Sequence, residues 1–76
     1  MEKQILIIED NQADIELIES VLERLEGSYQ LHTFTNAIEP LDLLLRGKLK
    51  VDLILLDLNL PKMNGIEFMV KLRSIE

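Results

Sequence analysis

The sequence predicts an α/β protein in which a parallel three-stranded sheet is flanked by helices, in the chain order βαβαβα. Three short segments, residues 5–8, 29–34 and 51–56, have the composition of strands. The segments between and after them carry apolar residues at helical spacing, beginning near Asn11, Asn36 and Asn64. Strands that alternate with helices imply a parallel sheet joined by right-handed crossovers.

The three predicted strands differ in character. Residues 5–8 are all aliphatic, which is typical of a strand buried on both faces. Residues 29–34 (YQLHTF) are partly polar and are typical of a sheet edge. Residues 51–56 form the most apolar of the three strands, yet they are followed at once by the carboxylate of Asp57. An unpaired carboxylate at the edge of a hydrophobic core destabilises the fold, so an acid at this position requires an explanation.

Capping residues and glycines mark the ends of the predicted helices. Asn11 is suited to cap the first helix, with Asp14 at its third position, and Gly27 follows its end. Asn36–Glu39 and Asn64–Glu67 have the spacing of capping boxes. The apolar positions expected to face the sheet are Ile15, Ile18, Val21, Leu22 and Leu25 in the first helix, Ile38, Leu41, Leu44 and Leu45 in the second, and Ile66, Met69 and Val70 in the third.

Composition limits the classes of function. The 76 residues have the composition of one globular domain, with 47% hydrophobic and 29% charged residues. A net charge of −6 without a basic run argues against nucleic acid or an anionic membrane surface as a partner. The sequence has no cysteine, no signal-peptide pattern and no apolar run of the roughly 20 residues that a membrane span needs. These features predict a cytoplasmic protein.

Acidic residues follow two of the three predicted strands. Glu9 and Asp10 come after the first strand, and Asp57 comes after the third. In a parallel sheet the carboxyl ends of the strands lie along one edge, so these carboxylates converge if the first strand lies between the other two. Hard oxygen donors without histidine or cysteine nearby favour Mg²⁺. A carboxylate beside such an ion can attack a phosphoryl group and form an acyl phosphate.

A simpler interpretation also exists for the same residues. Asp57 could cap the turn that follows its strand, and Glu9 and Asp10 could do no more than solvate a strand end. For one acid alone this would be the preferred interpretation. The occurrence of acids at the ends of two strands favours the metal site.

These motifs resemble the receiver domain of bacterial two-component response regulators. The resemblance lies in Glu9-Asp10-Asn11 after the first strand and in the segment 55–61 (LLDLNLP) followed by Gly65. It implies half of a flavodoxin-like receiver fold in which Asp57 accepts a phosphoryl group from a histidine kinase or phosphotransfer protein and becomes 4-aspartylphosphate. It further implies that Asp10 and Asp57 ligate Mg²⁺, that Glu9 acts mostly through water, and that Asn59 contributes its backbone carbonyl.

The sequence also departs from the family pattern. A complete receiver has a fourth strand that supplies a Ser or Thr and a fifth that supplies a Lys, both directed at the phosphoryl group. Neither strand has a counterpart in residues 1–76, which we expect to be a truncated receiver domain of three βα units. None of the lysines in this sequence, Lys62 and Lys71 included, matches the position of the missing lysine. Phosphotransfer by this chain is therefore expected to be impaired.

Two functions are compatible with the sequence. The first is a phosphoacceptor receiver, which is a signalling module and not an enzyme in its own right. The second is a half-domain without phosphotransfer that acts as an interaction or dimerisation module through its open sheet edge. In both cases the apolar third strand predicts self-association as a homodimer.

Overall fold

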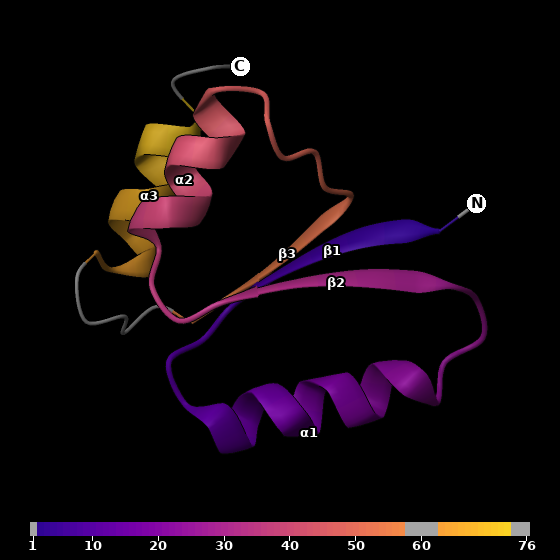
Figure 1. The fold of residues 1–76 in the computed structure, drawn as a ribbon. Coiled ribbons are helices and arrows are strands. Elements are labelled where there is room, and N and C mark those ends of the chain that lie inside the picture. The colour runs from indigo at the N-terminus through magenta and orange to yellow at the C-terminus, as the bar shows by residue number, and fades with distance from the viewer. Residues whose placement is uncertain (1, 58–62, 74–76) are drawn as a thin grey trace.

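The structure is a computed structural model that describes residues 2–57 and 63–73. Its elements follow the predicted order βαβαβα (Figure 1). The strands are β1 (Lys3–Ile8), β2 (Tyr29–Phe34) and β3 (Leu53–Leu56), and the helices are α1 (Gln12–Glu23), α2 (Ile38–Leu45) and α3 (Gly65–Arg73). None of the described helices is long and apolar enough to cross a membrane.

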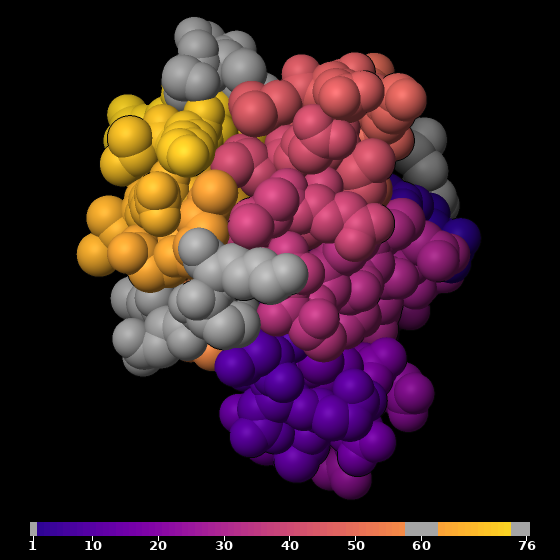
Figure 2. All heavy atoms as spheres, turned by 60° about the vertical axis from the view of Figure 1, so that its left-hand side comes forward, coloured from indigo at the N-terminus to yellow at the C-terminus, as the bar shows by residue number. Residues whose placement is uncertain are grey.

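The sheet has the strand order β2-β1-β3, and both pairings are parallel. Ile5 pairs with Leu53 and Ile8 with Leu56, so the carboxyl ends of β1 and β3 lie level with each other. Helix α1 covers one face of the sheet, whereas α2 and α3 lie side by side on the other face (Figures 1 and 2). The predicted α/β fold with a central first strand is therefore confirmed.

Alternation along β1 divides the core between the two faces of the sheet. Leu6 and Ile8 pack with Phe68 of α3 in a fully buried cluster that also contains Ala37 and Leu41. The intervening residues Ile5 and Ile7 are buried as well, as is Ile15 of α1. Because β1 is buried on both faces, its residues are apolar throughout and do not alternate between apolar and polar.

The helix whose buried side differs most from the prediction is α3. Ile66 and Val70 are each 65% exposed and Met69 is 50% exposed, while Phe68 is fully buried. The helix begins at Gly65, so its inward positions are Gly65, Phe68 and Leu72. Spacings of three and four residues define one helical face, and the sequence offered two such faces. The prediction took the wrong one.

The other two helices show smaller departures. In α1, Val21 is 52% exposed, and Leu25 lies beyond the helix end at Glu23 and is 51% exposed. In α2, Ile38 is 48% and Leu45 is 43% exposed, whereas Pro40 is buried beside Leu41 in the first turns. A helix packed on one sheet face buries a narrow stripe, so apolar residues on its flanks remain in contact with water.

Candidate functional site

The acidic residues lie at the carboxyl ends of β1 and β3, just beyond the last paired residues. The backbone N–H of Asp57 donates a hydrogen bond to the carbonyl of Ile8, at 3.0 Å. The N–H of Glu9 donates in the same way to the carbonyl of Phe34, also at 3.0 Å. The sheet hydrogen bonding therefore continues one residue past each strand, and it fixes the backbone from which both carboxylates project.

The turn from β1 into α1 is held by side-chain caps. The Asn11 side chain accepts hydrogen bonds from the N–H groups of Ala13 (2.9 Å) and Asp14 (3.2 Å), as predicted for the helix cap. One carboxylate oxygen of Glu9 accepts a hydrogen bond from the N–H of Asn11, at 3.1 Å. This bond ties the Glu9 side chain to the turn that leads into α1.

Three carboxylates converge at this edge. One oxygen each of Glu9, Asp10 and Asp57 lies within 4.8 Å of the others; Glu9 and Asp57 are half-buried and Asp10 is exposed. Burial raises the pKa of Glu9 above its ordinary value of 4.5, and the charges of Asp57 and Asp14 raise it further, against the hydrogen bond from Asn11. Like charges at this spacing repel each other unless a cation lies among them. The oxygen donors fit a hard divalent cation such as Mg²⁺.

The segment that follows Asp57 is described only from Met63 onward. The predicted ligand Asn59, like Pro61, lies outside the described residues. Asn64 caps α3 as predicted, since its side-chain oxygen accepts a hydrogen bond from the N–H of Glu67 at 2.8 Å. Helix α3 begins at Gly65, directly after this capping residue.

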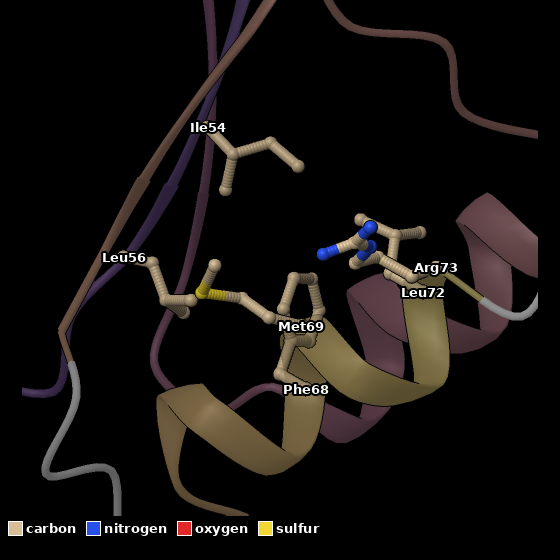
Figure 3. A pocket seen from close by; sticks show the side chains of 6 residues that line it. All are labelled: Ile54, Leu56, Phe68, Met69, Leu72 and Arg73. Carbon is tan, nitrogen blue, oxygen red and sulfur yellow. The ribbon is translucent and has the colours of Figure 1, made fainter. Parts of the chain in front are cut away.

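An apolar groove that the sequence pattern did not predict lies between β3 and α3. Its volume is about 520 Å³, and it is lined by Ile54, Leu56, Phe68, Met69, Leu72 and Arg73 (Figure 3). The available signal was the absence of any polar residue from Leu53 to Leu56. Leu53, on the α1 face of the sheet, is 48% exposed. The groove lies on the opposite face.

The raised pKa of Glu9 predicts a pH-dependent cost to stability in the absence of metal. An acid whose pKa is higher in the folded than in the unfolded state stabilises the fold below the unfolded value, and this contribution is lost as the pH rises through the folded value. We therefore expect Glu9→Gln to be more stable than the wild type at pH 7 in EDTA, and the difference to shrink toward pH 4. Urea unfolding at several pH values measures this. A stability difference that is independent of pH would contradict the electrostatic cause.

The sequence and the structure match known receivers. The response regulator receiver domain family matches residues 5–76. The polar-differentiation response regulator DivK of Brucella anthropi is 34% identical over 67 residues, which are 88% of this chain and 51% of DivK. The phosphorylated cyanobacterial phytochrome response regulator RcpA superposes with a TM-score of 0.83 at 36% identity, over 97% of this chain and 56% of RcpA.

A further structural relative was solved with a metal ion. The receiver domain of the sensor histidine kinase PA1611 from Pseudomonas aeruginosa, with magnesium coordinated in its active-site cleft, superposes with a TM-score of 0.82 at 27% identity. The match covers 97% of this chain and 57% of that domain. The chain thus spans about half the length of these relatives. With the fold and the family match in agreement, the chain belongs to the response regulator receiver domain family.

Proposed function

We propose that Asp57 accepts a phosphoryl group from a phosphohistidine on a partner histidine kinase or phosphotransfer protein. The observation that supports this proposal is the convergence of Glu9, Asp10 and Asp57, whose oxygens lie within 4.8 Å of one another at the carboxyl edge of a receiver-type sheet. The magnesium ion reported for the PA1611 receiver domain supports the same metal here. Asp10, Asp57 and the backbone carbonyl of Asn59 would ligate Mg²⁺, with Glu9 acting mostly through water.

The transfer requires little covalent chemistry from the protein. A carboxylate oxygen of Asp57 forms the new bond to phosphorus, the bond from phosphorus to the donor histidine nitrogen breaks, and the imidazole leaves with the electron pair. Bound Mg²⁺ would offset the negative charge of the phosphoryl oxygens. The backbone bond from Asp57 to Ile8 keeps the attacking carboxylate in place, and Glu9 is held by its bond from Asn11.

Binding of Mg²⁺ provides a test of the metal site. A ligand that binds only the folded state adds about 2.7 kcal/mol to the free energy of unfolding at 100 times its Kd. We expect Mg²⁺ to raise the melting temperature of the wild type and to have much less effect on Asp10→Asn. Glu23→Gln, which removes one charge at the far end of α1, serves as the matched control and should respond like the wild type. Equal responses of all three proteins would contradict the site.

Slow phosphotransfer is a separate expectation. The Ser or Thr and the Lys that the family resemblance places on later strands have no counterpart in residues 1–76. Without them, less of the charge that develops on the phosphoryl group is compensated. We expect labelling by a small acyl phosphate to be slower than for the complete PA1611 receiver domain measured in parallel. Equal rates would show that these later residues contribute little.

The second candidate function is an interaction module without phosphotransfer, and a specific observation favours it. Among the described residues β3 pairs only with β1, its four residues are all aliphatic and Leu53 is 48% exposed, so we propose this strand as the surface for self-association as a homodimer. Labelling separates the two functions, because only a phosphoacceptor should incorporate phosphate in a Mg²⁺-dependent reaction.

For either function we propose a cytoplasmic signalling module that acts through protein partners and not as an enzyme. We propose no contact with nucleic acid or membrane through this chain.

A further inference from the structure

A second cavity lies between α1 and β2, on the face of the sheet opposite to α3. Its volume is about 220 Å³, and one continuous segment of the chain, residues 19–31, supplies all of the side chains that line it. Pockets that hold cofactors and drug-sized molecules have volumes of roughly 300–1,000 Å³. The cavity is smaller than these, and its size suits one inserted side chain.

The cavity lies at the end of the sheet where the strands begin. Tyr29, the first residue of β2, pairs with Lys3, the first residue of β1. The acidic cluster with Asp57 lies beyond the other end of the sheet, after Ile8. The turn that joins α1 to β2, on the right of Figure 1, is thus separated from Asp57 by the six residues of β1, at about 3.3 Å each. A single side chain in the cavity is too far from Asp57 to contact it.

The walls of the cavity combine an aromatic ring with aliphatic side chains. Leu22 of α1 and Leu31 of β2 line it and are half-buried, as is Tyr29. The hydroxyl group of Tyr29 donates a hydrogen bond to the carbonyl of Glu26 at 3.1 Å, which holds the ring against the turn. Gly27 adopts a φ of +117° in this turn, and a Cβ atom there would lie 3.6–3.8 Å from the Tyr29 side chain. A side chain at this glycine would therefore lie against the ring.

Two carboxylates of α1 complete the lining. Glu19 is half-buried and Glu23 follows it by four residues, so both side chains project from the same side of the helix. Like charges at this spacing destabilise a helix, and no lysine or arginine lies three or four residues from either glutamate. Within the described part of the chain, neither side chain forms a hydrogen bond or an ion pair. The cavity thus carries two negative charges that no described residue compensates.

We propose that this cavity binds one arginine side chain of a partner protein. The aliphatic stem of an arginine packs on the two leucines, its guanidinium plane stacks on the Tyr29 ring, and its N–H groups donate hydrogen bonds to the two carboxylates. Lysine fits less well, because its ammonium group is more strongly hydrated and presents no plane to an aromatic ring. The proposal is independent of phosphotransfer, since neither the cavity nor its charges involve Asp57.

Peptide binding tests the charge that the cavity selects. The probe is the peptide acetyl-Gly-Arg-Gly-amide, and the signal is the fluorescence of Tyr29, which is the only tyrosine of the 76 residues; tryptophan is absent. We expect a saturable change in fluorescence. The same peptide with citrulline, which has nearly the shape of arginine without its charge, should bind at least about fivefold more weakly. Equal binding of the two peptides, or tighter binding of a lysine peptide, would overturn the proposal.

Substitutions of one charge identify the residues that hold the probe. Glu19→Gln should weaken binding of the arginine peptide about threefold. Glu39→Gln is the matched control, because it removes the same charge from an exposed position of α2, on the other face of the sheet. This variant should bind the peptide like the wild type. Equal losses in the two variants would show that net charge alone attracts the peptide, and would overturn the site.

Substitutions of the ring separate stacking from the hydroxyl group. For these variants binding is followed by the NMR shifts of the Gly27 and Ser28 amides, and circular dichroism confirms that each variant is folded. Tyr29→Leu should weaken binding about threefold, whereas Tyr29→Phe, which keeps the ring, should stay within about twofold of the wild type. Full binding by a folded Tyr29→Leu would contradict the stacking.

A second copy of this chain is the alternative occupant, and mass distinguishes it from a partner protein. Light scattering across concentration should give the same mass for the wild type and for Glu19→Gln. A lower mass for Glu19→Gln would assign the cavity to a second copy and would overturn the proposal of a partner. None of these measurements uses labelling of Asp57, so a failure of the proposed phosphoacceptor function would leave their outcome unchanged.

Discussion

The Asp57→Asn variant should incorporate no phosphate from a small acyl phosphate under conditions in which the wild-type chain is labelled slowly and only with Mg²⁺. The amide of asparagine is a poor nucleophile, and it also removes one anionic oxygen from the cluster with Glu9 and Asp10. The expected effect is a complete loss of signal, which is larger than any change in rate that the surrounding residues would cause. Incorporation is measured with radiolabelled donor after rapid separation.

A matched control distinguishes this loss from a general effect of the substitution. Asp42→Asn removes the same charge from an exposed residue of α2 that pairs with Arg46 at 3.0 Å. Exposed pairs of this kind contribute little to stability, so the variant should fold and be labelled like the wild type. Labelling of Asp57→Asn at the wild-type rate would place the chemistry on another residue.

The second large effect is expected in the core. Phe68 is fully buried and packs in the cluster with Leu6, Ile8 and Leu41 beneath α2 and α3. Phe68→Ala removes buried surface and leaves a cavity, which costs about 3–5 kcal/mol. A natural domain of this size has a total stability of only about 4–11 kcal/mol. We therefore expect the variant to be largely unfolded or to lose most of its resistance to urea, as measured by circular dichroism.

The same helix provides the control for that substitution. Val70→Ala removes apolar side-chain atoms from a residue that is 65% exposed, and it should change the free energy of unfolding by less than about 0.5 kcal/mol. The pair also tests which face of α3 is inward. A larger loss from Val70→Ala than from Phe68→Ala would support the face first predicted from the sequence and contradict the packing described here.

Local sequence patterns predicted the strands and the helix caps well, because each pattern depends on residues that lie close together in the chain. The aliphatic run at residues 5–8 marks the buried central strand, and Asn11 and Asn64 accept the hydrogen bonds expected of helix caps. The meeting of Glu9 and Asp10 with Asp57 was also predictable, since parallel strands align their carboxyl ends at one edge.

The inward face of α3 could not be chosen from spacing alone. Ile66, Met69 and Val70 have helical spacing, but so do Gly65, Phe68 and Leu72, and only tertiary packing decides between the two sets. The groove beside β3 was missed for the same reason, because its shape depends on how far α3 stands from the strand. The predicted backbone ligand at Asn59 remains a prediction.

The phosphoacceptor role of Asp57 is tested most directly by locating the phosphoryl group on the chain. Borohydride reduces an acyl phosphate to an alcohol, which converts a phosphorylated aspartate into homoserine, and mass spectrometry of proteolytic peptides then identifies the modified residue. After treatment with acyl phosphate and Mg²⁺, we expect the modification at Asp57, and its loss when Mg²⁺ is chelated. Homoserine at any other aspartate, or at Asp57 to the same extent without metal, would contradict the proposed phosphoacceptor site.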